Sequence, residues 1–303
     1  MKTTTKIKLA LQKKMPEALF LKTLNIYRTL TTFKPYSFDE IKLLSFKKVI
    51  TKKLKYRNID YKLILNPENG LLDKNIYLNG PYEKDILNEF MKVVKSGDVC
   101  LDVGANIGHH SIFLAKLVGE TGRVIAFEPI PKLADQIEDS ARENKLENLK
   151  VVVSALGEKN YETVIHINKY VIGSSSLLPT RYGTDVEKVN IKVSKLDDMC
   201  GDLKINKIDF IKIDVEGYEW FVLDGAKETI SKYKPKIVIE YSPEYYRQND
   251  ITHMDMIISF LRDNNYSVYD IENENKEILD DEDFKNSFGV NLRSQTNLLC
   301  LVK

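Results

Sequence analysis

The stretch Val99-Cys-Leu-Asp-Val-Gly-Ala-Asn-Ile-Gly108 decides the fold of this chain. It begins as an apolar run typical of a buried strand and ends in a turn set by two glycines. Gly104 and Gly108 let the backbone pass close to a ligand because they have no Cβ, and Asn106 tolerates a left-handed conformation. A strand that leads through such a turn into a helix places an open helix N-terminus beside a ligand.

A second apolar run, Arg123-Val-Ile-Ala-Phe-Glu-Pro129, follows about twenty positions later and ends on one acid. Asp102 and Glu128 thus stand at the ends of neighbouring strands, where a carboxylate accepts hydrogen bonds from an amine or from ribose hydroxyls. Each feature alone is more often an ordinary turn or a solvated strand end. The joint order of strand, acid, glycine loop, helix, strand and acid indicates a site for a nucleotide-type cofactor.

The glycine spacing separates two kinds of cofactor. A dinucleotide-dependent oxidoreductase needs G-x-G-x-x-G, so that the helix N-terminus can approach a pyrophosphate. Here three residues separate Gly104 from Gly108, and the carboxylate of Asp102 stands two positions before the first glycine. That charge repels a pyrophosphate and attracts the ammonium and sulfonium groups of S-adenosylmethionine (SAM). Charge and spacing therefore favour SAM.

Six blocks occur in a fixed order between Gly80 and Pro243: Asp102–Gly108, Ala126–Pro129, Ser154–Gly157, Ser174–Leu177, Ile208–Glu219 and Val222–Ala226. In residues and order they resemble the FkbM family of SAM-dependent methyltransferases. The block Ile208–Glu219 is the most specific, because many unrelated methyltransferases share the first one. The resemblance implies a SAM-binding doubly wound fold and O-methylation, most often of a sugar or a glycan-like product.

The order of elements predicts an α/β fold with a doubly wound, mostly parallel sheet covered on both faces. Two final strands, with no helix expected between them, pair antiparallel at the far edge, which resembles the seven-stranded Rossmann-like sheet of SAM methyltransferases. An extra strand pair with a serine loop follows the third strand, where loops usually select the substrate. The expected strands are 99–103, 124–127, 150–154, 163–167, 189–193, 210–213, 237–240, 266–271 and 298–302, and the expected helices are 112–118, 133–144, 220–232 and 254–264.

Residues 1–80 differ in character and form an N-terminal helical and β-hairpin extension to a SAM-dependent methyltransferase domain at 81–303. Apolar residues near the start recur with helical spacing among dispersed lysines. Such a helix suits an anionic membrane surface, but packing on its own domain or on a second subunit is the simpler expectation. Tyr61–Leu65 and Asn75–Leu78 flank a turn, so we expect a strand, a turn and a strand.

Composition and cysteine use exclude few functions. The 303 residues are 43% hydrophobic and carry 45 Lys and Arg against 44 Asp and Glu, a net charge of +1 that draws no nucleic acid. Cys100, Cys200 and Cys300 are too far apart for a zinc clip or a disulfide framework. Lys13 and Lys14 interrupt any signal peptide, and no apolar run is long enough to span a bilayer. We therefore expect a cytoplasmic enzyme, peripheral to the inner membrane face only if its first helix binds there.

The chemistry is expected in the segment Lys212-Ile-Asp-Val-Glu216, at the end of the fourth strand. Alternation along an extended segment places Lys212, Asp214 and Glu216 on one side, and Glu240 ends the adjacent strand. A hydroxyl that attacks a methyl group must lose its proton, so one of these acids acts as general base. Alternatively, Asp214, Glu216 and Glu240 hold a divalent cation such as magnesium. Asp214 and Glu216 could also cap the helix expected after them, and metal dependence stays open.

Histidines and aromatic residues near the strand ends give weaker signals. His110, more than His109, is a candidate base because an imidazole titrates near neutrality, although a histidine at a helix start is more often a packing residue. Trp220 is expected to pack against the sheet. The tyrosines after the fifth strand either stack on a sugar face or close the core; they are Tyr241, Tyr245 and Tyr246.

We predict a SAM-dependent O-methyltransferase that acts on a hydroxyl of a sugar or glycoconjugate acceptor. The alternatives are a catalytically inactive SAM-binding interaction module and a dinucleotide-dependent oxidoreductase. The acceptor's identity and the oligomeric state do not follow from the sequence. Candidate catalytic residues are Asp214, Glu216, Lys212, Glu240 and His110, and candidate cofactor-binding residues are Tyr82, Glu83, Asp102, Gly104, Ala105, Asn106, Gly108, Glu128, Ser154, Ala155, Leu156 and Asp214.

Overall fold

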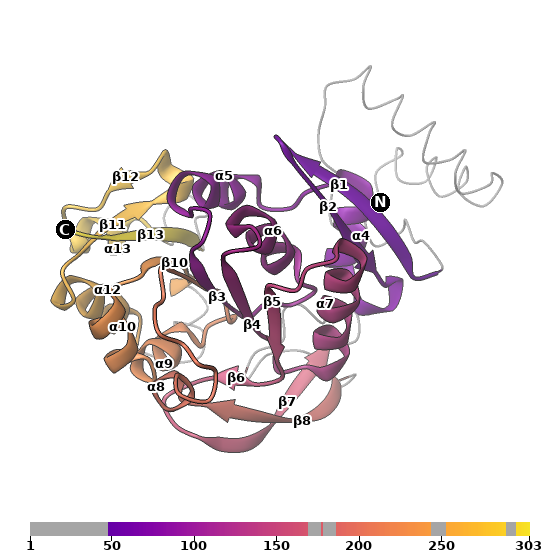
Figure 1. Ribbon diagram of the computed structural model, residues 1–303. Helices are drawn as coiled ribbons and strands as arrows, with labels where there is room; N and C mark the ends of the chain where they lie inside the picture. The colour runs from indigo at the N-terminus through magenta and orange to yellow at the C-terminus, as the bar shows by residue number, and fades with distance from the viewer. Residues whose placement is uncertain (1–47, 169–176, 178–185, 244–252, 289–294) are drawn as a thin grey trace, which may run out of the picture.

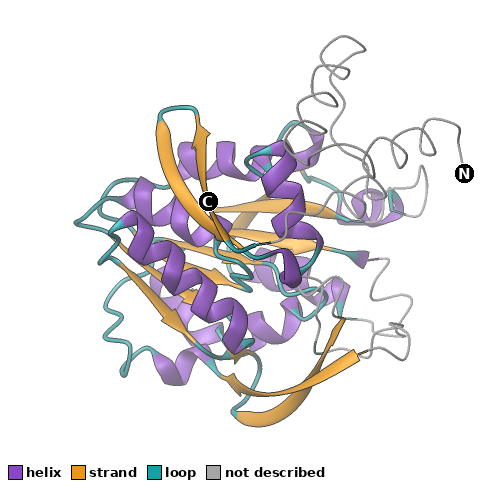
Figure 2. Ribbon diagram, turned by 90° about the vertical axis from the view of Figure 1, so that its right-hand side faces the viewer, coloured by secondary structure: helices purple, strands orange, loops and turns teal. Residues whose placement is uncertain are grey.

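The structure, a computed structural model, describes residues 48–168, 177, 186–243, 253–288 and 295–303. A central sheet carries helices on both faces (Figures 1 and 2). Its strand order is β12-β11-β13-β10-β9-β3-β4-β5. In chain order these strands are β3 (Val99–Val103), β4 (Arg123–Phe127), β5 (Leu149–Val152), β9 (Phe210–Ile213), β10 (Lys236–Tyr241), β11 (Tyr266–Asp270), β12 (Lys276–Glu277) and β13 (Thr296–Val302).

The sheet confirms the predicted doubly wound topology. β10, β9, β3, β4 and β5 run parallel, and β13 is antiparallel to both of its neighbours, β10 and β11. The two-residue strand β12 adds an eighth member at the edge. The predicted strands 99–103 and 210–213 are correct to the residue, since both are almost entirely buried apolar runs with no polar alternation to blur their ends.

Helices cover the two faces of the sheet. Their buried side chains belong to two separate hydrophobic clusters. One cluster contains α5 and α6, and the other contains α9, α10 and α12. Trp220 of α9 packs edge to face on Phe260 of α12, as expected of a residue packed against the sheet. The helices are α5 (Lys84–Val93), α6 (His109–Val118), α7 (Pro131–Asn144), α8 (Leu196–Met199), α9 (Glu219–Asp224), α10 (Lys227–Tyr233), α12 (Met254–Asp263) and α13 (Asp281–Asn286), with a 3-10 turn η3 (Ile271–Asn273).

Two helix predictions were wrong. The single helix expected at 220–232 is broken into α9 and α10 at Gly225, where a Cβ would lie 1.9 Å from the carbonyl oxygen of Gly157. The chain turns there because another backbone passes directly against it. A short helix, α13, also lies between β11 and β13, where none was expected, and Asp280 caps it by accepting hydrogen bonds from the amides of Glu282 and Asp283.

The extra strand pair after β5 is confirmed and lies in a separate small sheet of order β6-β8-β7. Its strands are β6 (Ala155–Leu156), β7 (Tyr161–Asn168) and β8 (Val186–Ser194), and β7 and β8 pair antiparallel. Of the serine loop between them, only Leu177 lies within the described residues.

The N-terminal hairpin exists, but it precedes the place where it was expected. Its strands are β1 (Ile50–Tyr56) and β2 (Ile59–Leu65). The predicted strand at 75–78 was wrong: after a 3-10 turn, η1 (Pro67–Asn69), the chain forms helix α4 (Leu71–Asn79). The lysines of β1 hid its strand signal, and the helix buries Ile76 completely. The helix predicted near the start lies in residues 1–47, outside the described part of the chain.

The hairpin packs on the two helices that follow the first two sheet strands. Tyr61 contacts Phe113 edge to face, and the hydroxyl of Ser140 accepts a hydrogen bond from the amide of Ile64 at 3.0 Å. The buried side chains of β1, β2 and α4 belong to the same hydrophobic cluster as those of α5 and α6. The domain boundary at residue 80 stays a prediction, but the packing is continuous across it.

Two of the cysteines and one of the three tyrosines at or after the end of β10 lie in the core. Cys100 and Cys300 are buried free thiols, and Cys200 is a half-buried free thiol. Tyr241 closes the core against Phe284 and Phe288, whereas Tyr245 and Tyr246 lie outside the described residues. Within the described ranges, no helix has the length and apolar character needed to cross a membrane.

Candidate active site

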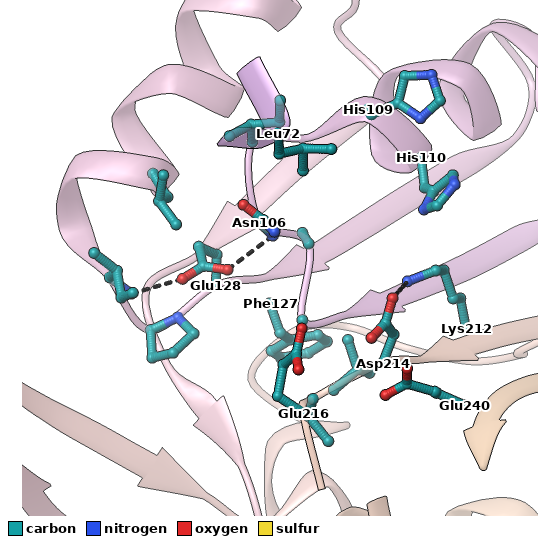
Figure 3. Close-up of a pocket in the computed structure, with 18 of the residues that line it drawn as sticks. Leu72, Asn106, His109, His110, Phe127, Glu128, Lys212, Asp214, Glu216 and Glu240 are labelled. Atoms are coloured by element: carbon teal, nitrogen blue, oxygen red, sulfur yellow. Dashed lines mark hydrogen bonds and ion pairs between the residues drawn. The ribbon is translucent and has the colours of Figure 1, made fainter. Parts of the chain in front are cut away.

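A cavity of about 400 Å³ opens at the carboxyl ends of β3, β4, β9 and β10 (Figure 3). This volume lies within the range of small-molecule sites, about 300 to 1,000 Å³. The wall combines the glycine loop after β3, the end of β4, the segment after β9 and residues from α4, β6 and β7. The cavity therefore lies where parallel α/β sheets bind their ligands, at the switch point between β3 and its neighbours.

The glycine loop is built by close backbone contacts. The amides of Gly104 and Ala105 both donate to the carbonyl oxygen of Phe127, at 3.0 Å each. Gly104 has φ of 80°, and a Cβ there would lie 1.9 Å from the carbonyl oxygen of Asp214. Asn106 adopts φ of 55°, as predicted. Only glycine at position 104 lets the loops after β3 and β9 pass each other.

Glu128 lines the cavity and also holds its loops in place. Its two carboxylate oxygens accept hydrogen bonds from the amides of Asn106 at 2.8 Å and Ile130 at 2.9 Å (Figure 3). Burial raises the pKa of Glu128 to about 8, against the opposing effect of these two hydrogen bonds. The predicted contact of this acid with ribose hydroxyls fits its position but stays a prediction.

Three predicted cofactor residues lie behind the cavity wall: Asp102, Gly108 and Ser154 are not among its lining residues. Asp102 is fully buried, accepts a hydrogen bond from the hydroxyl of Ser111 at 2.5 Å, and keeps one carboxylate oxygen without a partner among the described residues. The hydroxyl of Ser154 bonds to that of Ser194 at 2.9 Å and so ties β6 to β8. These residues support the wall, and direct contact with a cofactor stays a prediction.

The catalytic residues predicted from the fourth strand do come together. All four, Lys212, Asp214, Glu216 and Glu240, line the cavity, as does Glu83, and Figure 3 shows Lys212, Asp214 and Glu240 gathered in one part of it. The ammonium of Lys212, only 2% exposed, donates to the carboxylate of Asp214 at 2.8 Å. Burial acts to lower the pKa of Lys212, but the surrounding carboxylates, Asp214 foremost, raise it above its ordinary value. Lys212 is therefore a permanent positive charge rather than a base.

The acids around Asp214 hold protons more tightly than free carboxyl groups do. Burial, and then the charge of Asp214, raise the pKa of Glu216 to about 8 and that of Glu83 to about 7. The same two causes raise the pKa of Glu240 well above its usual range. Glu216 and Glu83 also have left-handed backbones, with φ of 55° and 46°, a conformation that non-glycine residues seldom adopt. Such strain often concentrates at functional sites.

His110 lines the cavity, but the expected near-neutral titration was wrong. Burial, and then the charge of Lys212, lower the pKa of His110 well below its ordinary value. The ring is thus neutral and weakly basic, with Nε2 3.5 Å from Oε2 of Glu83. His109 shares a hydrogen bond of 2.9 Å with the hydroxyl of Tyr61 and so fastens the hairpin to α6.

The structure also brings in residues that sequence reasoning missed. Leu71, Leu72 and Asn75 of α4 line the cavity, as do Ile165 of β7 and Leu177. The α4 residues were missed because that segment was interpreted as a turn and a strand. The four-residue spacing of Leu72 and Ile76 was an available helix signal.

Asp214, Glu216 and Glu240 were also proposed as metal ligands. Across the described ranges of the chain, no group of three or more His, Cys, Asp or Glu side chains has an arrangement that could hold a metal ion. Magnesium dependence is therefore without support from the geometry, and the acids are treated below as proton-binding groups.

The cavity suits SAM in charge and in polarity. Carboxyl groups in the wall can receive an ammonium and a sulfonium, and leucine and isoleucine side chains in the same wall can cover an adenine ring. The fold and this cavity define a SAM-dependent methyltransferase. The family model of the methyltransferase FkbM domain matches residues 102–268, more than half of the chain. The chain belongs to the FkbM methyltransferase family, and the oxidoreductase alternative is set aside.

Curated relatives agree with this class. The 2-O-methyltransferase NoeI of Sinorhizobium fredii is 26% identical over 165 residues, which cover 50% of this chain and 65% of that protein. Protein-L-isoaspartate O-methyltransferase 2 of Archaeoglobus fulgidus is 31% identical over 103 residues, which cover 34% of this chain and 46% of that protein. The chain thus spans less than two thirds of the length of these relatives. A solved methyltransferase FkbM from Methylobacillus flagellatus aligns at 19% identity with a TM-score of 0.44, over 78% of this chain and 56% of that one.

Proposed function

We propose that this methyltransferase transfers the methyl group of SAM to a hydroxyl group of a sugar or glycoconjugate. One observation carries the proposal: an ionised Lys212–Asp214 pair and a proton-binding acid, Glu216, line the same cavity as the glycine loop. The hydroxyl as acceptor is supported by the relative named 2-O-methyltransferase NoeI.

The charged end of the cavity suits the methionine half of the cofactor. SAM, when bound, supplies an electrophilic methyl group on a positively charged sulfur. Asp214, kept in place by Lys212, offers a negative charge to the ammonium and the sulfonium. Glu128 and the glycine loop, which line the same cavity, would then face the ribose. Residues from the ends of β9 and β10, which line the cavity, would then be the ones near the methyl group.

Glu216 is the general base in this proposal. Burial and the charge of Asp214 raise its pKa to about 8, near neutral pH, where a positioned base transfers protons effectively. As the new bond between the acceptor oxygen and the methyl carbon forms, the bond from that carbon to sulfur breaks, and the hydroxyl proton passes to Glu216. Asp214 is less suited to this task, because Lys212 already binds its carboxylate.

The test is methyl transfer from isotope-labelled SAM to a panel of free sugars, glycolipids and isoaspartyl peptides, with products identified by mass spectrometry and alkali treatment. We expect an alkali-stable methyl ether on a sugar hydroxyl. An alkali-labile ester on a carboxyl group, or methyl transfer to nitrogen, would contradict the proposal. Glu216→Gln should lower kcat by roughly a hundredfold or more while SAM still binds, whereas the exposed control Glu120→Gln should keep full activity.

A further inference from the structure

Helix α4 reaches the cavity from outside the part of the chain that the family model matches. Leu71, Leu72 and Asn75 line the cavity, whereas the matched region begins at residue 102. The two leucines are half-buried, so part of their apolar surface faces the open cavity. Apolar surface in a concave site is available for a ligand to cover.

The α4 wall lies at the end of the cavity away from the charged groups. In Figure 3, Leu72 lies above the glycine loop near Asn106, whereas Lys212, Asp214 and Glu240 gather on the opposite side. Ile130, just before α7, and Leu133 of its first turn also line the cavity, and Leu72 packs against the hydrophobic cluster that contains both. Glu128 lies between Asn106 and these residues and bonds to both loops. The cavity thus has a charged end, a carboxylate in the middle and an apolar end.

This polarity orients the cofactor. The ammonium and sulfonium are drawn to the carboxyl groups, ribose hydroxyls find an acceptor in Glu128, and the adenine ring remains for the apolar end. We propose that α4 forms one wall of the adenosine subsite, with Leu71 and Leu72 covering the adenine ring opposite the start of α7. The N-terminal segment is then part of the cofactor site rather than an appendage.

A buried polar network fixes α4 in this position. Asp73, fully buried, accepts hydrogen bonds from the amide of Asn66 at 2.7 Å and from the side chain of Gln136 at 2.8 Å. The same side-chain nitrogen of Gln136 donates to the carbonyl oxygen of Ile64 at 2.7 Å. The side-chain oxygen of Gln136 accepts a hydrogen bond from the side-chain amide of Asn69. Gln136 belongs to α7, whose first turn forms the facing wall. The network therefore ties the two walls of the adenosine subsite to each other.

The inference rests on SAM as methyl donor and is independent of the acceptor. The experiment is calorimetric titration of the full chain with SAM, S-adenosylhomocysteine and 5′-methylthioadenosine, which carries the adenosine half alone. Leu72→Ala should weaken all three by the same factor, about fivefold to thirtyfold. Leu71→Ala should also weaken the binding of all three ligands, and Leu72→Met should bind them with wild-type affinity.

Leu78→Ala is the matched control, because Leu78 is a half-buried leucine of the same helix that does not line the cavity. It should change each affinity by less than about twofold. Unchanged binding of 5′-methylthioadenosine by Leu72→Ala and Leu71→Ala, with melting curves like the wild type, would overturn the proposal. Weaker binding of SAM together with unchanged binding of 5′-methylthioadenosine would also overturn the proposal, because that result would place the methionine half of SAM against α4. No acceptor enters these titrations, so they stay decisive even if the sugar proposal fails.

Discussion

The two ends of the cavity differ in how they are held together. At the charged end, the buried ammonium of Lys212 lies among half-buried carboxyl groups, and their positions depend on mutual charge. At the apolar end, leucines and isoleucines form the lining, and the hydrogen bonds of Gln136 to the carbonyl oxygen of Ile64 and to the carboxyl group of Asp73 fix the helices behind them. The difference teaches that the acids at the charged end can gain or lose protons during methyl transfer, whereas the helices at the apolar end are held in a fixed position that suits cofactor binding.

The largest expected effect comes from removing the positive charge at the charged end. Lys212→Met leaves the buried carboxyl group of Asp102 and the half-buried one of Asp214 without their counter-ion, so we expect the free energy of unfolding to fall by about 3 to 5 kcal/mol. Urea unfolding measures it. The matched change Lys207→Met, which removes an exposed pair with Asp209, should cost less than about 1 kcal/mol. Equal losses in both variants would show that the charged end has no special organisation.

Gly104→Ala should be next in size, because a Cβ there meets the carbonyl oxygen of Asp214 at 1.9 Å in a left-handed backbone. We expect a loss of about 2 kcal/mol or more, and SAM binding lost with it. Gly80→Ala separates the two causes, since Gly80 also has positive φ but no atom within 4 Å of a Cβ. If Gly80→Ala destabilises as much as Gly104→Ala, the close approach of the two loops is unimportant.

The apolar end is tested by Asp73→Ala, which removes the acceptor for Asn66 and Gln136. Unpaired buried donors cost about 1 to 3 kcal/mol, and 5′-methylthioadenosine should bind more weakly because α4 is no longer fixed. Lys74→Ala, on the same helix, serves as the control. Weaker folding without weaker binding would separate the network from the adenosine subsite.

The smallest effect is a pH dependence that distinguishes the two ends. The pKa values of Glu83 and Glu216 are raised to about 7 and about 8, so both groups lose protons as pH rises towards these values, and the charged end becomes more negative. Lys212 stays charged and His110 stays neutral over this range. The affinity for SAM relative to 5′-methylthioadenosine should therefore increase about threefold to tenfold from pH 5.5 to 7.5. A constant ratio would contradict the assignment of the cofactor's charged half to this end.

The same raised pKa values affect folding with the opposite sign. Because Glu216 and Glu83 bind protons more tightly in the folded chain than in the unfolded one, the ligand-free protein is most stable when both are protonated. This contribution to stability decreases as pH rises from about 5 towards 8. Thermal melting in the absence of SAM should show that decrease, and Glu216→Gln should reduce it.

The sequence predicted best where local pattern and burial agree. The strands at 99–103 and 210–213, the glycine loop and the meeting of Asp214 with Glu216 were all predicted correctly. Depth was not predictable: Asp102 ends up behind the wall because alternation gives the side of a strand, not its distance from a cavity. The break at Gly225 depends on contact with Gly157, which no local pattern contains.

The apolar end was missed for a related reason. Its residues come from α4 and the start of α7, segments that meet only when the chain folds. The pKa of His110 was likewise set by burial and by Lys212, which is distant in sequence. The charged end was predictable because three of its residues alternate in one short stretch.

The most direct test of the account is a crystal structure of the full chain with S-adenosylhomocysteine bound. The account predicts the adenine ring between α4 and the start of α7, against Leu72 and Ile130, and the ammonium group beside Asp214. An adenine ring beside Asp214 instead, or a ligand bound outside the cavity, would contradict it.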